Sequence, residues 1–146
     1  MDRRALAALA LTLAAAAASA SSATPALAAV TACGTGSGHV VSLSNGTASP
    51  GSALLGTSFA FSVTYTDNRG CAPLAVTVTV AGVGTVELAS SGSTAYRSGV
   101  VFGGTMTPPA GTWLYSFSTT SSGPGGVSSA TLTAVAPASI LVTAPP

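Results

Sequence analysis

The sequence predicts an all-β protein, folded as an antiparallel β-sandwich of about seven to nine strands. Three observations lead to this prediction. Short runs of alternating apolar and polar residues follow one another along the chain, clusters of Gly, Pro, Asn, Asp and Ser separate them, and no stretch after residue 28 has helical periodicity with caps. Alternation indicates strands with one buried face, because successive side chains of a strand point to opposite sides of the sheet.

The two clearest predicted strands are 57–66 and 112–120. In each, large apolar side chains alternate with small or polar ones, which places the large ones on a single face. Together these faces hold six of the eight aromatic residues of the chain: Phe59, Phe61, Tyr65, Trp113, Tyr115 and Phe117. Because two such half-buried strands need a facing layer to cover them, a two-sheet sandwich is favoured.

The remaining predicted strands are shorter. They are 39–44, 74–80, 85–89, 98–106, 128–135 and 140–142. Asn45-Gly46 is predicted to form a tight turn after the first of them, and residues 121–126 a loop rich in Gly, Pro and Ser. The last run, 140–142, is either a short strand or a sticky tail.

Residues 1–28 have the pattern of a bacterial secretory signal peptide. A short, mostly basic start precedes an alanine-rich apolar run over 5–18, which is too short to span a membrane as a helix. Cleavage is predicted after Ala28, with Ala20 as the alternative, because Pro25 ends the helix just before the former site. The rest divides into an N-terminal segment with Cys33 (29–44), the sandwich (45–136) and a Pro-containing tail (137–146). The Pro-rich end leaves open that this is the front piece of a longer protein.

The chain has two cysteines, Cys33 and Cys71, and both lie in the part predicted to be exported. In an oxidising compartment two cysteines most simply pair, so a disulfide between them is expected. A competing interpretation is lipidation of Cys33, because Val30-Thr31-Ala32-Cys33 resembles a bacterial lipobox. Lipidation would anchor the chain in the membrane, but a lipobox normally follows the apolar run directly, and here residues 21–25 intervene.

Charge is scarce, at 5% of the residues, and there is no lysine. Beyond residue 28 the four charged residues sum to zero: Asp67, Arg69, Glu87 and Arg97. Binding of nucleic acid is not expected, because neutralising phosphates requires clustered Lys and Arg. An electrostatic attraction to anionic membranes is not expected for the same reason. We therefore expect contact with a membrane only if Cys33 is lipidated.

Few residues are available for catalysis or metal binding. An acid–base pair needs two titratable groups brought together, and nothing in the sequence brings Asp67 and Glu87 together. His39, the only histidine, is predicted to be a solvated strand or loop residue, and with two cysteines it falls short of a zinc ligand set. We expect no catalytic residue, no metal site and no cofactor.

Two stretches resemble the immunoglobulin-like repeats of bacterial secreted and surface proteins, in the general class of PKD and cadherin-like domains. One is Phe59-Ala60-Phe61-Ser62-Val63-Thr64-Tyr65-Thr66-Asp67 with Gly70, Ala72 and Pro73; the other is Pro109-Ala110-Gly111-Thr112-Trp113-Leu114-Tyr115-Ser116-Phe117. The resemblance covers about residues 57–118 and implies an immunoglobulin-like sandwich. Many such repeats carry several acidic residues in the turn, sometimes as calcium ligands. Here Asp67 stands alone, so we expect it to cap the turn rather than bind calcium.

The expected function is that of a non-enzymatic, secreted module with a structural or adhesive role at the cell surface. Its partner would be an extracellular protein or a polysaccharide, or a second copy joined through open sheet edges. The alternatives are a carbohydrate-binding module and an envelope lipoprotein lipidated at Cys33. The alternation of Trp113 and Tyr115 with Phe117 favours core packing over a sugar-stacking platform.

Overall fold

The computed structural model describes residues 33–34, 37–133 and 139–146, so the predicted signal peptide and its cleavage sites at Ala20 and Ala28 lie outside the described residues. Across these ranges the chain forms ten β-strands and no α-helix, which confirms the predicted all-β class. The search of the described residues for a helix long and apolar enough to cross a membrane found none.

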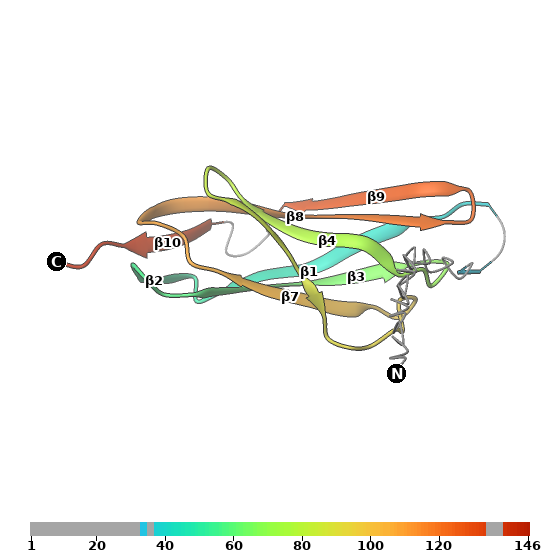
Figure 1. Cartoon of the computed structure of the whole chain (residues 1–146), viewed down its shortest axis with the longest axis horizontal. Helices are drawn as coiled ribbons and strands as arrows, with labels where there is room; N and C mark the ends of the chain where they lie inside the picture. The colour runs from blue at the N-terminus through green and yellow to red at the C-terminus, as the bar shows by residue number, and fades with distance from the viewer. Residues whose placement is uncertain (1–32, 35–36, 134–138) are drawn as a thin grey trace, which may run out of the picture. The chain divides into compact units, whose positions relative to one another are not determined.

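The strands form two sheets (Figure 1). The first sheet has the order β1 (Val41–Ser49), β3 (Phe59–Asp67), β7 (Val100–Met106) and β6 (Ala89–Ser90). The second has the order β2 (Ser52–Leu54), β10 (Ser139–Thr143), β8 (Gly111–Gly123), β4 (Pro73–Val80) and β5 (Gly84–Glu87), with β9 (Gly126–Thr133) also pairing with β8. All pairs are antiparallel except β2 with β10, which are parallel, so the second sheet is mixed rather than purely antiparallel as predicted.

The core lies between the two sheets and is built from the alternating faces that the sequence indicates. Along β3 and β8 the aromatic side chains point inward, and the ring of Phe61 meets that of Tyr115 edge-to-face at 5.3 Å across the sandwich. Five of the six aromatic residues predicted to share these faces are at most 2% exposed. Trp113 is half-buried and packs against the same core, with its indole Nε1–H donating to the carbonyl of Pro109 at 2.8 Å.

The prediction of a tight turn at Asn45-Gly46 is wrong, because these residues lie within β1. The register of β1 against β3 shifts between Ser44 and Thr47, which marks a β-bulge, and Asn45 has a φ of 53°. Asparagine tolerates this left-handed conformation better than most residues. Gly46 is buried, and a Cβ there would lie 2.7 Å from the ring of Phe117. The pair thus lets the strand continue close to the opposite sheet.

The sandwich extends beyond the predicted range of 45–136 at both ends. β1 begins at Val41, and β10 is a full member of the second sheet rather than a tail, with Ile140 completely buried between the sheets. The predicted loop at 121–126 shrinks to a tight turn, because β8 and β9 pair from Ser116–Thr133 down to Gly123–Gly126. The predicted strand 85–89 divides into β5 and β6, which belong to different sheets.

Candidate functional site

The structure pairs Cys33 with Cys71, as predicted, with their Cα atoms 4.8 Å apart. The disulfide joins the N-terminal segment to the turn that follows β3. Closing a loop between residues 38 positions apart stabilises the fold by about 4 kcal/mol in the chain-entropy model. The pairing occupies the Cys33 sulfur, which is the atom that lipidation would modify.

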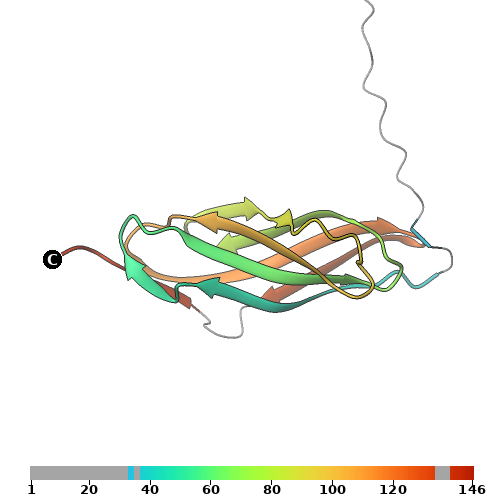
Figure 2. The ribbon, with the colours of Figure 1, turned by 90° about the horizontal axis from the view of Figure 1, so that it is seen from below.

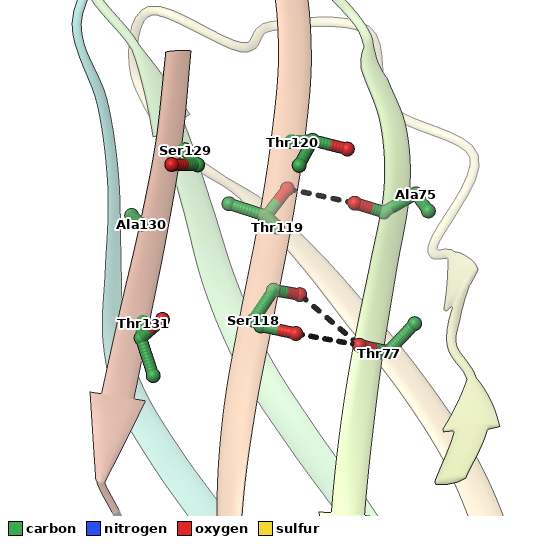
Figure 3. A pocket seen from close by; sticks show the side chains of 8 residues that line it. All are labelled: Ala75, Thr77, Ser118, Thr119, Thr120, Ser129, Ala130 and Thr131. Carbon is green, nitrogen blue, oxygen red and sulfur yellow. Dashed lines mark hydrogen bonds between the residues drawn. The ribbon is translucent and has the colours of Figure 1, made fainter.

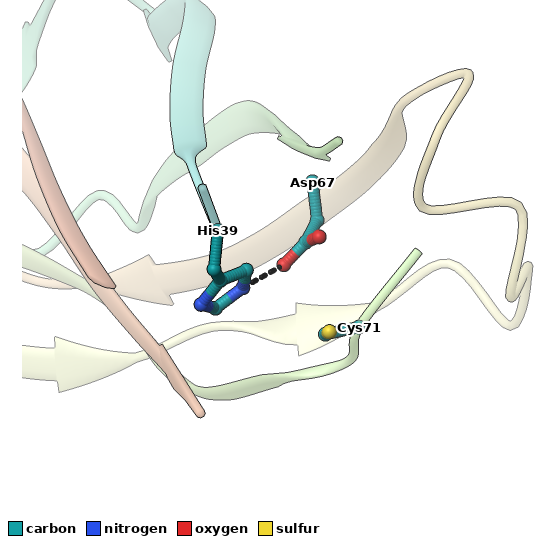
Figure 4. Close-up of side chains that lie close together, drawn as sticks. All are labelled: His39, Asp67 and Cys71. Atoms are coloured by element: carbon teal, nitrogen blue, oxygen red, sulfur yellow. Dashed lines mark hydrogen bonds and ion pairs between the residues drawn. The ribbon is translucent and has the colours of Figure 1, made fainter. Parts of the chain in front are cut away.

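Beneath the disulfide lies a group of buried polar side chains, here called the polar cluster: His39, Tyr65, Asp67 and Ser121. Asp67, the last residue of β3, is completely buried at its centre. One carboxylate oxygen, Oδ2, accepts a hydrogen bond from the side chain of His39 at 2.8 Å (Figure 4). It also accepts hydrogen bonds from the hydroxyls of Tyr65 and Ser121 at 2.9 and 3.3 Å. The other, Oδ1, accepts one from the backbone N–H of Arg69 at 2.7 Å, which is the turn-capping role predicted for Asp67.

The prediction that His39 is solvated is wrong, since its side chain is only 2% exposed. Its Nε2 faces the Asp67 carboxylate, and its Nδ1 faces the carbonyl oxygen of Gly126 at 3.2 Å. The imidazole thus bridges the Asp67 carboxylate and the Gly126 carbonyl, which joins the N-terminal segment to the end of β3 and to the start of β9.

The hydrogen bonds of the cluster fix the protonation states of its acidic groups. Burial alone would raise the pKa of the Asp67 carboxyl, but hydrogen bonds from His39, the Arg69 N–H, Tyr65 and the Cys71 N–H outweigh it and hold the pKa below its ordinary value of 3.8. For the Tyr65 hydroxyl, burial and the neighbouring carboxylate raise the pKa far above its ordinary value. Asp67 therefore stays ionised as an acceptor, and Tyr65 stays a donor.

Two further residues of the turn after β3, Asn68 and Arg69, form hydrogen bonds with the N-terminal segment. The Asn68 amide accepts from the backbone N–H of Val40 at 2.9 Å and donates to the carbonyl of Gly38 at 2.8 Å. The guanidinium group of Arg69 donates to the carbonyl of Ser37. With the disulfide and the His39–Asp67 pair, these contacts hold the first described residues against the fold.

The ligating atoms of His39, Asp67 and Cys71 lie within 4.8 Å of one another, which is close enough to hold a metal ion (Figure 4). The Cys71 sulfur, however, is bonded to Cys33. That leaves one imidazole and one carboxylate, whereas zinc sites use three or four protein ligands. A Cβ placed on the neighbouring Gly123 would lie 2.8 Å from the Cys71 sulfur and 2.9 Å from the His39 ring. The cluster is thus tightly packed, and its geometry fits a structural role.

A second feature, here called the hydroxyl face, is the outer surface of β4, β8 and β9. A shallow groove of about 310 Å³ runs along it (Figure 3), lined by Ala75, Thr77, Ser118, Thr119, Thr120, Ser129, Ala130 and Thr131. The hydroxyls of Thr77 and Ser118 bond each other at 2.8 Å across the strands. None of the residues that line the groove is charged or aromatic.

Sequence reasoning missed the meeting of His39 with Asp67. The two residues are 28 positions apart and share no motif. The signal that could have indicated it was the predicted disulfide, which brings the segment after Cys33 to the turn that contains Asp67 and Cys71. Glu87, the other acid considered, lies exposed on β5.

No known family model matches the chain, and no curated protein matches it in sequence. The resemblance to immunoglobulin-like repeats therefore stays a prediction from residues 57–118. What the polar cluster and the hydroxyl face can do is therefore inferred from the positions and contacts of their own residues.

Proposed function

We propose that this protein is a non-enzymatic, exported immunoglobulin-like module with a structural or adhesive role at the cell envelope. The observation that carries the proposal is the use of its titratable side chains. His39, Tyr65 and Asp67 are buried in mutual hydrogen bonds that hold the chain together. A general acid or base must instead reach the proton of a bound substrate. The groove on the hydroxyl face offers only hydroxyl and methyl groups around its entrance.

The strand order supports the immunoglobulin-like part of the proposal. The order β1-β3-β7-β6 opposite β10-β8-β4 matches the ABED and GFC sheets of that fold when these seven strands are lettered A to G along the chain and the additional strands β2, β5 and β9 are left out. The chain departs from antibody domains in its disulfide, which ties the N-terminal segment to the turn after β3 rather than joining the two sheets.

Export is supported by the disulfide, because such bonds persist in oxidising compartments. Intact mass of the protein isolated from its own host, before and after reduction, tests this part. We expect a chain that starts at Ala29 and gains about two daltons on reduction. A chain that starts at Cys33 and carries acyl groups would replace the exported domain with an envelope lipoprotein.

Two experiments test the adhesive role: binding of the purified protein to host cells, and deletion of its gene. The purified exported protein, fluorescently labelled, should bind host cells, and a strain lacking the gene should lose cell–cell or surface attachment that the wild-type gene restores. Sedimentation velocity at increasing concentration would show self-association. A protein that stays monomeric, binds no cells and whose removal changes no attachment would exclude the adhesive role.

A second candidate, binding of a neutral polysaccharide, is favoured by the uncharged groove of the hydroxyl face. The site would work by hydroxyl–hydroxyl hydrogen bonds, since the aromatic rings of the chain are buried or half-buried. Affinity electrophoresis in gels that contain neutral polysaccharides tests it. Retardation that Ser118→Ala with Thr77→Val abolishes, and that Thr85→Val on the neighbouring β5 preserves, would support this candidate; equal mobility in all gels would remove it.

A further inference from the structure

We infer that the Cys33–Cys71 disulfide directs mechanical tension past the first three strands and into the sheet formed by β4, β8 and β10. The inference deepens the proposed structural or adhesive role, on which it rests, because a module that links two bodies at the envelope carries load between its ends. The described chain is suited to such loading. Its blue N-terminal start and its C-terminus lie at opposite ends of the sandwich, and the strands run along the long axis between them (Figure 2).

Without the disulfide, tension would reach the hydrogen bonds between residues 37–40 and the turn after β3, and then β1, the first strand that it meets. This strand lies at the edge of its sheet, and in the described part of the chain it pairs with β3 alone. Its ladder is interrupted by the bulge at Asn45 and Gly46. An edge strand with a broken ladder has few hydrogen bonds to resist sliding, so β1 would detach first.

With the disulfide, tension passes from Cys33 to Cys71 through the sulfur atoms. Residues 34–70, which include β1, β2 and β3, then lie inside a closed loop, so no tension passes along their backbone. The load enters β4, which begins two residues after Cys71 and is paired on both edges, with β8 along its length and with β5 over Thr77–Val80.

The load leaves through β10, which pairs with the other edge of β8 and with β2. Both β4 and β10 run from the disulfide end toward the C-terminal end (Figure 1). Pulling on the start of β4 and on the end of β10 therefore shears them along β8. Ladder hydrogen bonds are perpendicular to the strands, so shear loads them together rather than one at a time.

Single-molecule force spectroscopy on the exported chain, with reference domains fused at both ends, tests the inference. The Cys33→Ser/Cys71→Ser variant should show an additional early rupture at lower force, as β1 leaves. Its total extension should exceed that of the disulfide-bonded protein by about 130 Å, since 38 residues are released at roughly 3.3–3.6 Å each. A variant that unfolds in one event at the original force would overturn the inference.

A matched pair of substitutions gives a second test in the disulfide-bonded protein, which does not depend on the folding of the cysteine variant. Val41 on β1 is 6% exposed and Val78 on β4 is fully buried. Val78→Ala should lower the unfolding force, whereas Val41→Ala should leave it unchanged, although both lower stability in denaturant because each removes buried methyl groups. If Val41→Ala lowers the force as much as Val78→Ala does, tension does not bypass β1.

The outcomes separate the two levels of the proposal. A module that binds no cells but shows the predicted force pattern would lose its adhesive role and keep its load path. A module that binds cells but unfolds from β1 would keep the role and lose the load path.

Discussion

The polar cluster and the hydroxyl face place polar groups in opposite environments. In the cluster a few ionised or strongly polar side chains are buried, and one carboxylate oxygen of Asp67 serves three side-chain donors. On the hydroxyl face many uncharged side chains lie at the surface, where pairs such as Thr77 and Ser118 bond each other beside water. A polar group without a hydrogen-bond partner destabilises the fold when it is buried, but it has little effect at the surface, where water bonds to it. The cluster should therefore decide stability, and the hydroxyl face should decide how the molecule meets its surroundings.

The largest effect should come from Asp67→Asn, which removes the charge while keeping the shape. An asparagine amide offers one oxygen and one NH2 group, so the donors on one side of the residue 67 side chain lose their acceptor. Each hydrogen bond lost to a charged group costs about 1.5–3 kcal/mol of unfolding free energy. Urea denaturation measures the change. Glu87→Gln is the matched control, because it removes the same charge from an exposed position, and it should change the free energy by no more than about 0.5 kcal/mol. If Asp67→Asn and Glu87→Gln lose the same unfolding free energy, the buried polar cluster contributes no more to stability than an exposed charge does.

Lowering the pH should remove the same charge reversibly. The pKa of Asp67 is held below its ordinary value of 3.8 in the folded protein, so its contribution to stability is fully present above that value. It should be lost as the pH falls through the folded pKa. The unfolding free energy of the wild type, followed from pH 6 downward, should decline more steeply than that of Asp67→Asn. If the unfolding free energies of the two proteins fall in parallel with pH, protonation of Asp67 is not the cause of the acid destabilisation.

Gly123→Ala should have a smaller effect, by crowding the cluster rather than discharging it. The added Cβ would lie 2.8 Å from the Cys71 sulfur and 2.9 Å from the His39 ring. Overpacking of this kind costs about 1–3 kcal/mol. Gly103→Ala, where the nearest contact is an ordinary 3.5 Å, serves as the control in thermal unfolding. If Gly123→Ala unfolds at the same temperature as the wild type, the side chains of the polar cluster can shift to accommodate the added methyl group.

The smallest effect should come from the hydroxyl face. Thr77→Val with Ser118→Ala removes a cross-strand hydrogen bond at a partly exposed site, and the unfolding free energy should change by less than about 0.5 kcal/mol. Solubility, measured by precipitation with ammonium sulfate, should fall instead, because the two hydroxyls are replaced by methyl or hydrogen. A large loss of unfolding free energy in this double variant would mean that the hydroxyl face, like the polar cluster, contributes to stability.

The success of sequence-based prediction follows the range of the interactions involved. Alternation along β3 and β8 is local, so it predicted the inward faces of Phe61 and Tyr115. The disulfide followed from having only two cysteines. The bulge at Asn45-Gly46 escaped prediction because the same dipeptide forms hairpin turns, and the ring of Phe117 that makes a buried glycine necessary lies on another strand.

The burial of His39 depends on still more distant partners. Its two ring nitrogens meet a carboxylate on β3 and a carbonyl at the start of β9. A lone histidine in a Gly-rich segment carries no periodicity that would indicate either partner. The candidate site was thus predictable only as far as the sulfur–sulfur bond that brings its segments together.

The parallel pairing of β2 with β10 has a consequence for the timing of folding. Leu141 aligns with Ser52, and the neighbouring Ile140 is completely buried in the core, so this part of the sandwich forms only when segments far apart in the sequence meet. Contacts this far apart in sequence are slow to form. If the chain is exported as we propose, the sandwich can be completed only after residues 139–143 have left the membrane channel.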